Sequence, residues 1–264
     1  MPITPLDYLE QVPRSGIKGR GTVVFLHAFP LNAKMWDAQL SAVADRGWRA
    51  IAPHFPGFGG SAAGARTVDD YAGSVIDLLD VLHVQEAVVL GCSMGGYVGL
   101  AVMRLAARYV HALVLVDTRS QPDTPEGIEG RKRMIQLVRE KGVAAIADEM
   151  VPRLVGATSH RDRPGVVAQV RALALEATVE GVVGGLETMK SRPDSTPLLA
   201  HVHVPALVIV GEEDVITPPA LSEDMHRAIA GSDLVIVPGS GHLPNLETPA
   251  AFNDALARFL DHRV

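Results

Sequence analysis

Short, almost wholly apolar runs recur along the chain, separated by longer segments in which apolar residues repeat at helical spacing. Since nearly every residue of a run is apolar, each run is typical of a strand buried on both faces of a sheet. The predicted strands are Thr22–Leu26, Arg49–Pro53, Ala87–Leu90, Ala112–Val116, Ala206–Val210 and Leu234–Val237. The predicted helices between them are Trp36–Arg46, Val68–Leu82, Gly95–Tyr109 and Pro218–Ile229. This alternation predicts an α/β fold with a mostly parallel sheet flanked by helices, and Leu6–Val12 is expected to add an antiparallel edge strand.

The alternation stops between Thr118 and Pro205, where the chain has helical patterns and no convincing strand. Four helices are predicted there: one from Pro125 to Gly142, one from Val143 to Gly156, one opening at Pro164, and Val179–Lys190. The first begins with a threonine cap, a proline and an acidic residue, which is a helix-start pattern. We therefore expect residues 119–196 to form an inserted helical cap, or lid. Residues 1–118 and 197–264 are then the core domain.

Composition and charge narrow the class of protein. The chain has 264 residues, 47% of them hydrophobic, and its 24 Lys and Arg against 30 Asp and Glu give a net charge of -6, so no nucleic-acid partner is indicated. The single cysteine, Cys92, allows no internal disulfide. Met1–Pro5 does not resemble a signal peptide, and the most apolar region, Val98–Val116, is interrupted by two arginines and a histidine. We expect a soluble, cytoplasmic protein without a membrane partner.

The most informative motif is Gly91-Cys92-Ser93-Met94-Gly95-Gly96, which lies between a predicted strand and a predicted helix. This is the Gly-x-Ser-x-Gly pattern in its strand–turn–helix context. The sharp turn holds the serine hydroxyl beyond the sheet, and the glycines leave room for the neighbouring backbone. The N-terminus of the following helix favours negative charge at the same place. Ser93 is therefore the candidate nucleophile.

A serine hydroxyl needs a base to attack at neutral pH, and the base needs a third group to orient it. His242 lies in a glycine-rich loop after the last predicted strand, which makes it the candidate base. Asp214 follows the preceding predicted strand and is the favoured acid, with Asp117 and Glu213 as rivals. The chain order Ser93, Asp214, His242 is that of a Ser-Asp-His hydrolase.

These motifs resemble the α/β-hydrolase superfamily across nearly the whole chain, and within it capped carboxylesterases, 3-oxoadipate enol-lactonases and cofactor-free haloperoxidases. Supporting stretches are Leu26–Pro30, Pro56–Ser61 and the run from Gly241 to Glu247. Two positions depart from the family pattern: Ala28 replaces a glycine, and His54 replaces an aspartate. The resemblance implies an oxyanion hole made of the backbone N–H groups of Phe29 and Met94, and it implies no metal and no organic cofactor.

Other features are interpreted as structural. Gly57–Ser61 lacks the third glycine and the helix of a nucleotide-binding loop. His201 and His203 have no third ligand nearby in the sequence, and Cys92 is expected to pack away from the tip of the turn. The arginines of the insertion are expected to form mainly a solvated surface, with contact between one of them and an acidic substrate as the alternative: Arg131, Arg133, Arg153, Arg161, Arg163 and Arg171.

The sequence thus predicts a serine hydrolase that cleaves small carboxylic esters through an acyl-enzyme, with an apolar pocket beneath the cap. The alternatives are a lactone hydrolase similar to the 3-oxoadipate enol-lactonases, a C–C bond hydrolase, a haloperoxidase-like perhydrolase, and a ligand receptor without turnover. A serine at the turn argues against epoxide hydrolase and haloalkane dehalogenase chemistry, which would need an aspartate there.

Overall fold

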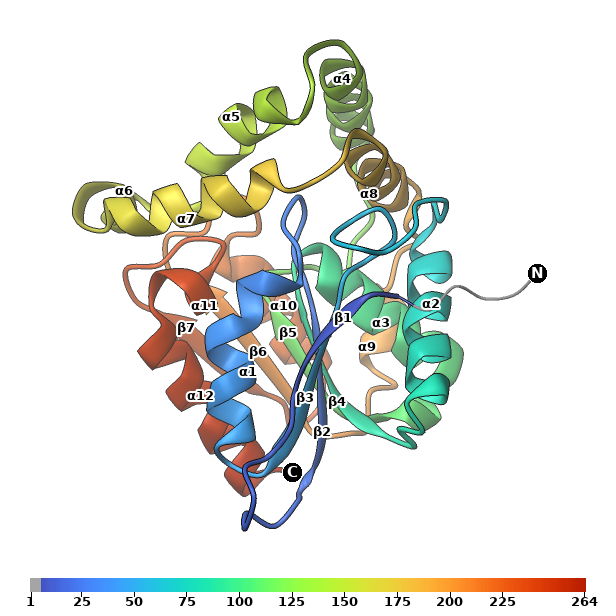
Figure 1. Ribbon diagram of the computed structural model, residues 1–264, viewed down its shortest axis with the longest axis vertical. Helices are drawn as coiled ribbons and strands as arrows, with labels where there is room; N and C mark the ends of the chain where they lie inside the picture. The colour runs from blue at the N-terminus through green and yellow to red at the C-terminus, as the bar shows by residue number, and fades with distance from the viewer. Residues whose placement is uncertain (1–5) are drawn as a thin grey trace.

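The chain folds around one seven-stranded sheet (Figure 1), in a computed structural model that describes residues 6–264. The strands are β1 (Tyr8–Gln11), β2 (Gly21–Leu26), β3 (Trp48–Pro53), β4 (Ala87–Cys92), β5 (Val110–Val116), β6 (Ala206–Gly211) and β7 (Asp233–Val237). Their order is β1-β3-β2-β4-β5-β6-β7, and only the β1–β3 pair is antiparallel. The expected α/β fold and the antiparallel edge strand are confirmed. The prediction about Met1–Pro5 lies outside the described residues.

The sheet is covered on both faces, which explains its continuous apolar strands. Helices α1 (Asp37–Ala44) and α12 (Pro249–His262) pack together on one face, and α2 (Val68–Val81) and α3 (Met94–Ala106) pack together on the other (Figure 1). Every residue of β4 and β6 is buried. Strands buried in this way carry no polar alternation, because neither face meets water. The remaining core elements are η1 (Ala33–Trp36), η2 (Ala107–Tyr109), α9 (Thr196–Leu199), α10 (Pro219–Ala228) and α11 (Pro244–Glu247).

Between β5 and α9 the chain forms five helices that lie together over one end of the sheet (Figure 1). They are α4 (Pro125–Lys141), α5 (Val143–Leu154), α6 (Ala157–Asp162), α7 (Pro164–Leu175) and α8 (Val179–Ser191). The four expected helices are present, and α6 is additional. Helix α4 begins as predicted, since the Thr124 side chain accepts a hydrogen bond from the N–H of Gly127. It ends at Gly142, whose φ of 76° is left-handed.

Within residues 6–264, none of the helices combines the length and apolar character needed to cross a bilayer.

Candidate active site

Ser93 occupies a strained turn between β4 and α3. Its φ of 53° lies in the left-handed region, which a non-glycine residue rarely adopts. A side chain on either neighbouring glycine is impossible: a Cβ on Gly91 would lie 2.2 Å from the carbonyl oxygen of Gly95, and one on Gly95 would lie 2.1 Å from that of Leu26. The N–H of Ser93 donates to the carbonyl of Val116 at 2.9 Å, which ties the turn to β5. The glycines of the motif are thus required by close backbone packing, and they hold Ser93 at the end of the sheet.

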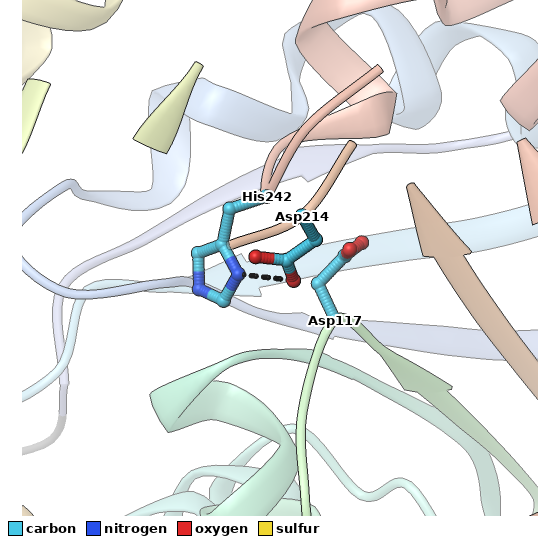
Figure 2. A group of neighbouring side chains, drawn as sticks. All are labelled: Asp117, Asp214 and His242. Atoms are coloured by element: carbon cyan, nitrogen blue, oxygen red, sulfur yellow. Dashed lines mark hydrogen bonds and ion pairs between the residues drawn. The ribbon is translucent and has the colours of Figure 1, made fainter. Parts of the chain in front are cut away.

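His242 and Asp214 form a buried pair (Figure 2). The Nδ1 atom of His242 lies 2.7 Å from Oδ2 of Asp214, and both side chains are almost fully buried. Asp214 follows β6, and His242 lies in the loop after β7. Since β6 and β7 are parallel neighbours, both loops leave the sheet at the same end. This topology brings together two residues that are 28 positions apart in the chain.

The Asp214 carboxylate has a complete set of hydrogen-bond partners. One oxygen accepts the N–H groups of Ile216 and Thr217 at 2.7 and 3.1 Å, and the other accepts the Thr217 hydroxyl at 2.6 Å as well as His242. Burial raises the pKa of this carboxyl, but the charge of His242 and the hydrogen bonds from His242 and Thr217 outweigh burial and hold the pKa well below its ordinary value. Asp214 is therefore ionised at neutral pH and oriented towards the imidazole.

The two rival acids have other surroundings. Asp117 lies beside the pair (Figure 2), but one of its oxygens accepts the N–H of Gly211 at 2.9 Å and the other has no partner among the described residues. Burial, followed by the charge of Asp214, raises the pKa of Asp117 well above its ordinary value, so its neutral form is favoured. Glu213 instead accepts the N–H of Thr158 at 2.8 Å, at the start of α6. The geometry supports Asp214 as the partner of His242.

Ligand atoms of Asp117, Asp214 and His242 lie within 4.8 Å of one another, a spacing that a metal ion could use. The residues fit this use poorly, because the four hydrogen bonds to Asp214 occupy the lone pairs that a metal would need. The group is better described as a histidine–carboxylate pair with a second carboxyl beside it.

Ser93 and His242 line the same cavity, which has a volume of about 40 Å³. We call it the inner cavity; its wall also includes Phe29 from the loop after β2, Tyr97 from α3, Met150 from α5 and Met189 from α8. Met94 follows Ser93 directly, opens α3 and is fully buried. The structure thus brings the predicted nucleophile, base and Phe29 to one cavity, with Asp214 behind the base.

His27 has a positioning role that the sequence analysis did not anticipate. Its Nε2 atom accepts the N–H of Phe55 at 2.9 Å, which leaves the ring proton on Nδ1, 3.0 Å from the carbonyl oxygen of Ala28. The ring therefore joins the loop that carries Phe29 to the loop after β3. The only sequence indication was a histidine at the end of a buried strand, which on its own does not reveal its partners.

Burial lowers the pKa of His27 to about 3 from the usual 6.5. Below pH 6.5 the unfolded chain therefore takes up a proton on His27 that the folded protein does not. The contribution of neutral His27 to the free energy of unfolding is complete above pH 6.5 and is lost as the pH falls towards 3. The loss is about 1.4 kcal/mol per pH unit. We expect the urea midpoint of the wild type to fall more steeply than that of His27→Gln between about pH 6 and pH 4. Equal slopes would show that the folded protein accepts this proton.

Comparison with known protein families assigns the chain to a family. The model of the alpha/beta hydrolase family matches residues 23–255. The chain belongs to the alpha/beta hydrolase family. It is 28% identical to 3-oxoadipate enol-lactonase 2 of Acinetobacter baylyi over 256 residues, which cover 96% of this chain and 94% of that protein.

Solved structures agree with this assignment. A malate-bound thermophilic esterase from Thermogutta terrifontis is 37% identical, with a TM-score of 0.91 and coverage of 97% of this chain and 93% of that one. The enol-lactonase of Burkholderia xenovorans is 28% identical, with a TM-score of 0.88 and coverage of 97% and 96%. The resemblance to the superfamily is confirmed, and membership of this hydrolase family supports hydrolase activity.

Glu247 of this alpha/beta hydrolase braces the loop that carries His242. One of its oxygens accepts the N–H groups of Gly241 and Leu243, at 2.8 and 3.3 Å, on either side of the histidine. The other oxygen accepts the N–H of Gly156, just before α6, at 2.8 Å. One buried carboxylate therefore fixes the His242 loop and attaches the helical insertion to it. The position of Glu247 at the end of the run from Gly241 was visible in the sequence, whereas these contacts were not.

The other sequence features of this hydrolase have structural surroundings. Cys92 is fully buried, its thiol lies 3.7 Å from the carbonyl oxygen of His242, and burial raises its pKa well above the usual value. Gly57 packs on α8, since a Cβ there would lie 2.5 Å from Cα of Gly181. His201 and His203 are exposed. The space beside Gly57 is therefore filled by α8, and the two histidines are exposed to solvent.

The expectation of a solvated arginine surface is correct for part of the insertion only. Arg161 and Arg171 form exposed ion pairs. Arg163, in contrast, donates to the carbonyl oxygens of Gly239 and Glu247 at 3.2 and 3.1 Å, so it holds the insertion against the His242 loop. Arg131 is also mostly buried, with 18% of its side chain exposed. For Arg131 and Arg163 the expectation was wrong. Tertiary contacts cover these side chains, and the spacing of apolar residues along a helix does not show which polar residues will be covered.

Proposed function

We propose that the chain is a serine hydrolase that cleaves small carboxylic esters, with Ser93 as nucleophile, His242 as base and Asp214 as the orienting acid. The observation that carries the proposal is the buried 2.7 Å contact between His242 and Asp214, made behind a cavity that His242 shares with Ser93. A carboxylate on Nδ1 keeps that nitrogen protonated and leaves Nε2 free to accept a proton. The strained turn at Ser93 and the family membership support the same assignment.

In this mechanism Nε2 of His242 takes the hydroxyl proton as Ser93 Oγ attacks the ester carbonyl carbon. The carbonyl oxygen becomes an oxyanion, for which the proposed donors are the backbone N–H groups of Phe29 and Met94. Collapse of the tetrahedral intermediate breaks the bond to the alcohol oxygen, which leaves with the proton from His242. Water then attacks the acyl-enzyme by the same route and releases the acid and Ser93. Loss of one oxyanion donor typically costs about 3–4 kcal/mol of transition-state stabilisation.

We also propose that residues 119–196 act as a cap over this site. Met150 of α5 and Met189 of α8 line the inner cavity, so helices of the insertion form part of its wall. Val138 of α4 and Leu154 of α5 are fully buried and are not part of the wall of the inner cavity. An inner cavity of about 40 Å³ favours small acyl groups, and larger substrates require the helices to move outwards.

The test is a series of 4-nitrophenyl esters from acetate to palmitate, assayed with the wild type and combined with labelling by a fluorophosphonate. We expect rates to be highest with short acyl chains, and the mass increase from the label to lie on the peptide that contains Ser93. Hydrolysis without labelling of Ser93, or labelling of another serine that abolishes hydrolysis, would contradict the assignment.

A lactone is the second candidate substrate, because two relatives with nearly full coverage of the chain are enol-lactonases by name. The same residues would open a lactone ring, with the leaving alcohol still attached to the acyl group. Parallel assays of simple lactones distinguish the two cases: Ser93-dependent turnover of lactones, with no turnover of any ester in the series, would favour the lactonase.

A further inference from the structure

Two arginines beside the inner cavity converge on one buried carboxylate. Asp123 has only 1% of its side chain exposed, and it accepts a hydrogen bond from Arg119 at 2.7 Å and one from Arg131 at 3.0 Å. A third arginine, Arg192, lies 2.9 Å from the same carboxylate. Three guanidinium groups thus surround a single negative charge, and the cluster keeps an excess of two positive charges.

Arg192 has a structural role within this cluster. It is almost fully buried, it donates to the carbonyl oxygens of Met189 and Gln121 at 2.7 and 3.0 Å, and its guanidinium lies 4.2 Å from the ring centre of Tyr97. Arg192 therefore links the end of α8 to Gln121, at the start of the insertion. Arg119 and Arg131 are the members that remain partly open to solvent, with 24% and 18% of their side chains exposed.

Arg119 and Arg131 both line the inner cavity together with Ser93 and His242. They also line a second, outer cavity of about 300 Å³, which reaches Arg133 and Arg153. The acidic residues on the wall of the outer cavity are Asp123, already paired, and Glu149. With four arginines and two carboxylates on its wall, the outer cavity has a net positive charge. The buried Nε of Arg119 has no hydrogen-bond partner among residues 6–264, so this guanidinium has an unused donor.

We propose that the substrate carries a carboxylate in addition to its ester or lactone bond, and that Arg119 and Arg131 bind this carboxylate beside Ser93. The inference rests on the proposed function and adds the substrate class to it. Asp123 shows that both guanidinium groups already converge on a carboxylate, and it holds them in place when no substrate is bound. A guanidinium presents its donors in a planar fork that matches a carboxylate, so charge and geometry agree.

The experiment compares matched esters with and without the carboxylate. On the acyl side, 4-nitrophenyl hydrogen succinate, glutarate and adipate are compared with the butyrate, valerate and hexanoate esters. On the alcohol side, 4-acetoxybutyrate is compared with butyl acetate. We expect kcat/KM of the wild type to favour the anionic member of at least one pair by about 10- to 100-fold, as one or two charge-assisted hydrogen bonds provide.

Three variants locate the effect. Arg119→Gln and Arg131→Gln should each remove most of this preference, measured within each variant as the ratio of kcat/KM for the anionic ester to kcat/KM for its neutral match. Arg171→Gln is the matched control, because Arg171 is a partly exposed arginine of α7 that lines neither cavity. It should leave the preference unchanged. If either cavity variant fails to fold, Arg119→Lys or Arg131→Lys, which keeps the charge but not the fork, replaces it and should reduce the preference in part.

The outcomes separate this inference from the proposed function. Ser93-dependent hydrolysis with a preference below threefold in every pair overturns the carboxylate site and leaves the esterase intact. If the protein hydrolyses neither an ester nor a lactone, the proposed function is overturned. The carboxylate site is then tested by calorimetry: glutarate should bind to the wild type and to Arg171→Gln, and it should not bind to Arg119→Gln. Without such binding, both are overturned.

Discussion

Replacing Ser93 with alanine is expected to lower kcat on short 4-nitrophenyl esters by about 10⁴-fold or more, because the acyl-enzyme cannot form without the hydroxyl oxygen. The variant keeps the backbone of the turn, since alanine meets the same steric limits as serine. Substrate binding should therefore remain. Initial rates at saturating ester, corrected for spontaneous hydrolysis, measure the effect.

Ser93→Gly separates chemistry from strain. The residue has a φ of 53° and a ψ of -113°, a conformation that glycine adopts easily and that costs another residue about 1–3 kcal/mol. Both variants should be inactive, but Ser93→Gly should melt about 2–4 °C above Ser93→Ala if about 1 kcal/mol of this strain is recovered. Activity in either variant would exclude Ser93 as the nucleophile. A lower melting temperature for the glycine variant would show that the turn stores no such strain.

Asp214→Asn is expected to lower kcat by about 10⁴-fold, even though asparagine has nearly the same shape. The carboxylate that faces Nδ1 of His242 at 2.7 Å becomes an amide, whose NH₂ group favours the wrong imidazole tautomer and cannot stabilise the imidazolium. Ground-state binding depends little on this charge, so KM should change much less than kcat. The measurement is the full dependence of rate on ester concentration.

Asp117→Asn provides the matched control. It makes the same substitution at the neighbouring carboxyl, whose pKa is raised, whereas the pKa of Asp214 is lowered. Burial raises the pKa of Asp117 well above the usual value, so an amide resembles the neutral form that burial favours. Its side chain can still accept the N–H of Gly211, the one hydrogen-bond partner of the Asp117 side chain among the described residues. We expect kcat to stay within about tenfold of the wild type. A loss in Asp117→Asn as large as that in Asp214→Asn would show that the two carboxyls act as one unit.

Much of the fold was readable from local pattern. Strands such as β4 and β6, buried on both faces, require uninterrupted apolar residues, and a start such as Thr124-Pro125 marks a helix by backbone chemistry alone. Helix α6 was missed because its six residues are too few for a periodic pattern. Helix α12 also lies outside the predicted set, although its buried residues Phe252, Leu256 and Phe259 follow helical spacing.

The candidate site was predictable to the extent that its parts carry their own chemical signature. The turn at Ser93 needs its glycines for local steric reasons, and the parallel sheet places the loops after β6 and β7 at one end, which favours Asp214 and His242. The sequence by itself therefore determined the fold class, the position of the turn and the candidates Ser93 and His242, and it favoured Asp214 over two rival acids.

Only the tertiary structure decided how other residues serve this site. Glu247 meets the N–H of Gly156 across 91 positions of the chain, His27 meets that of Phe55 across 28, and Arg131 turned out to be mostly buried beside the cavity. The choice between Asp214 and Asp117 likewise depended on which carboxyl reaches the imidazole. These contacts are single polar interactions between distant segments; they repeat with no period along the chain, and their strength depends on burial that exists only in the packed molecule.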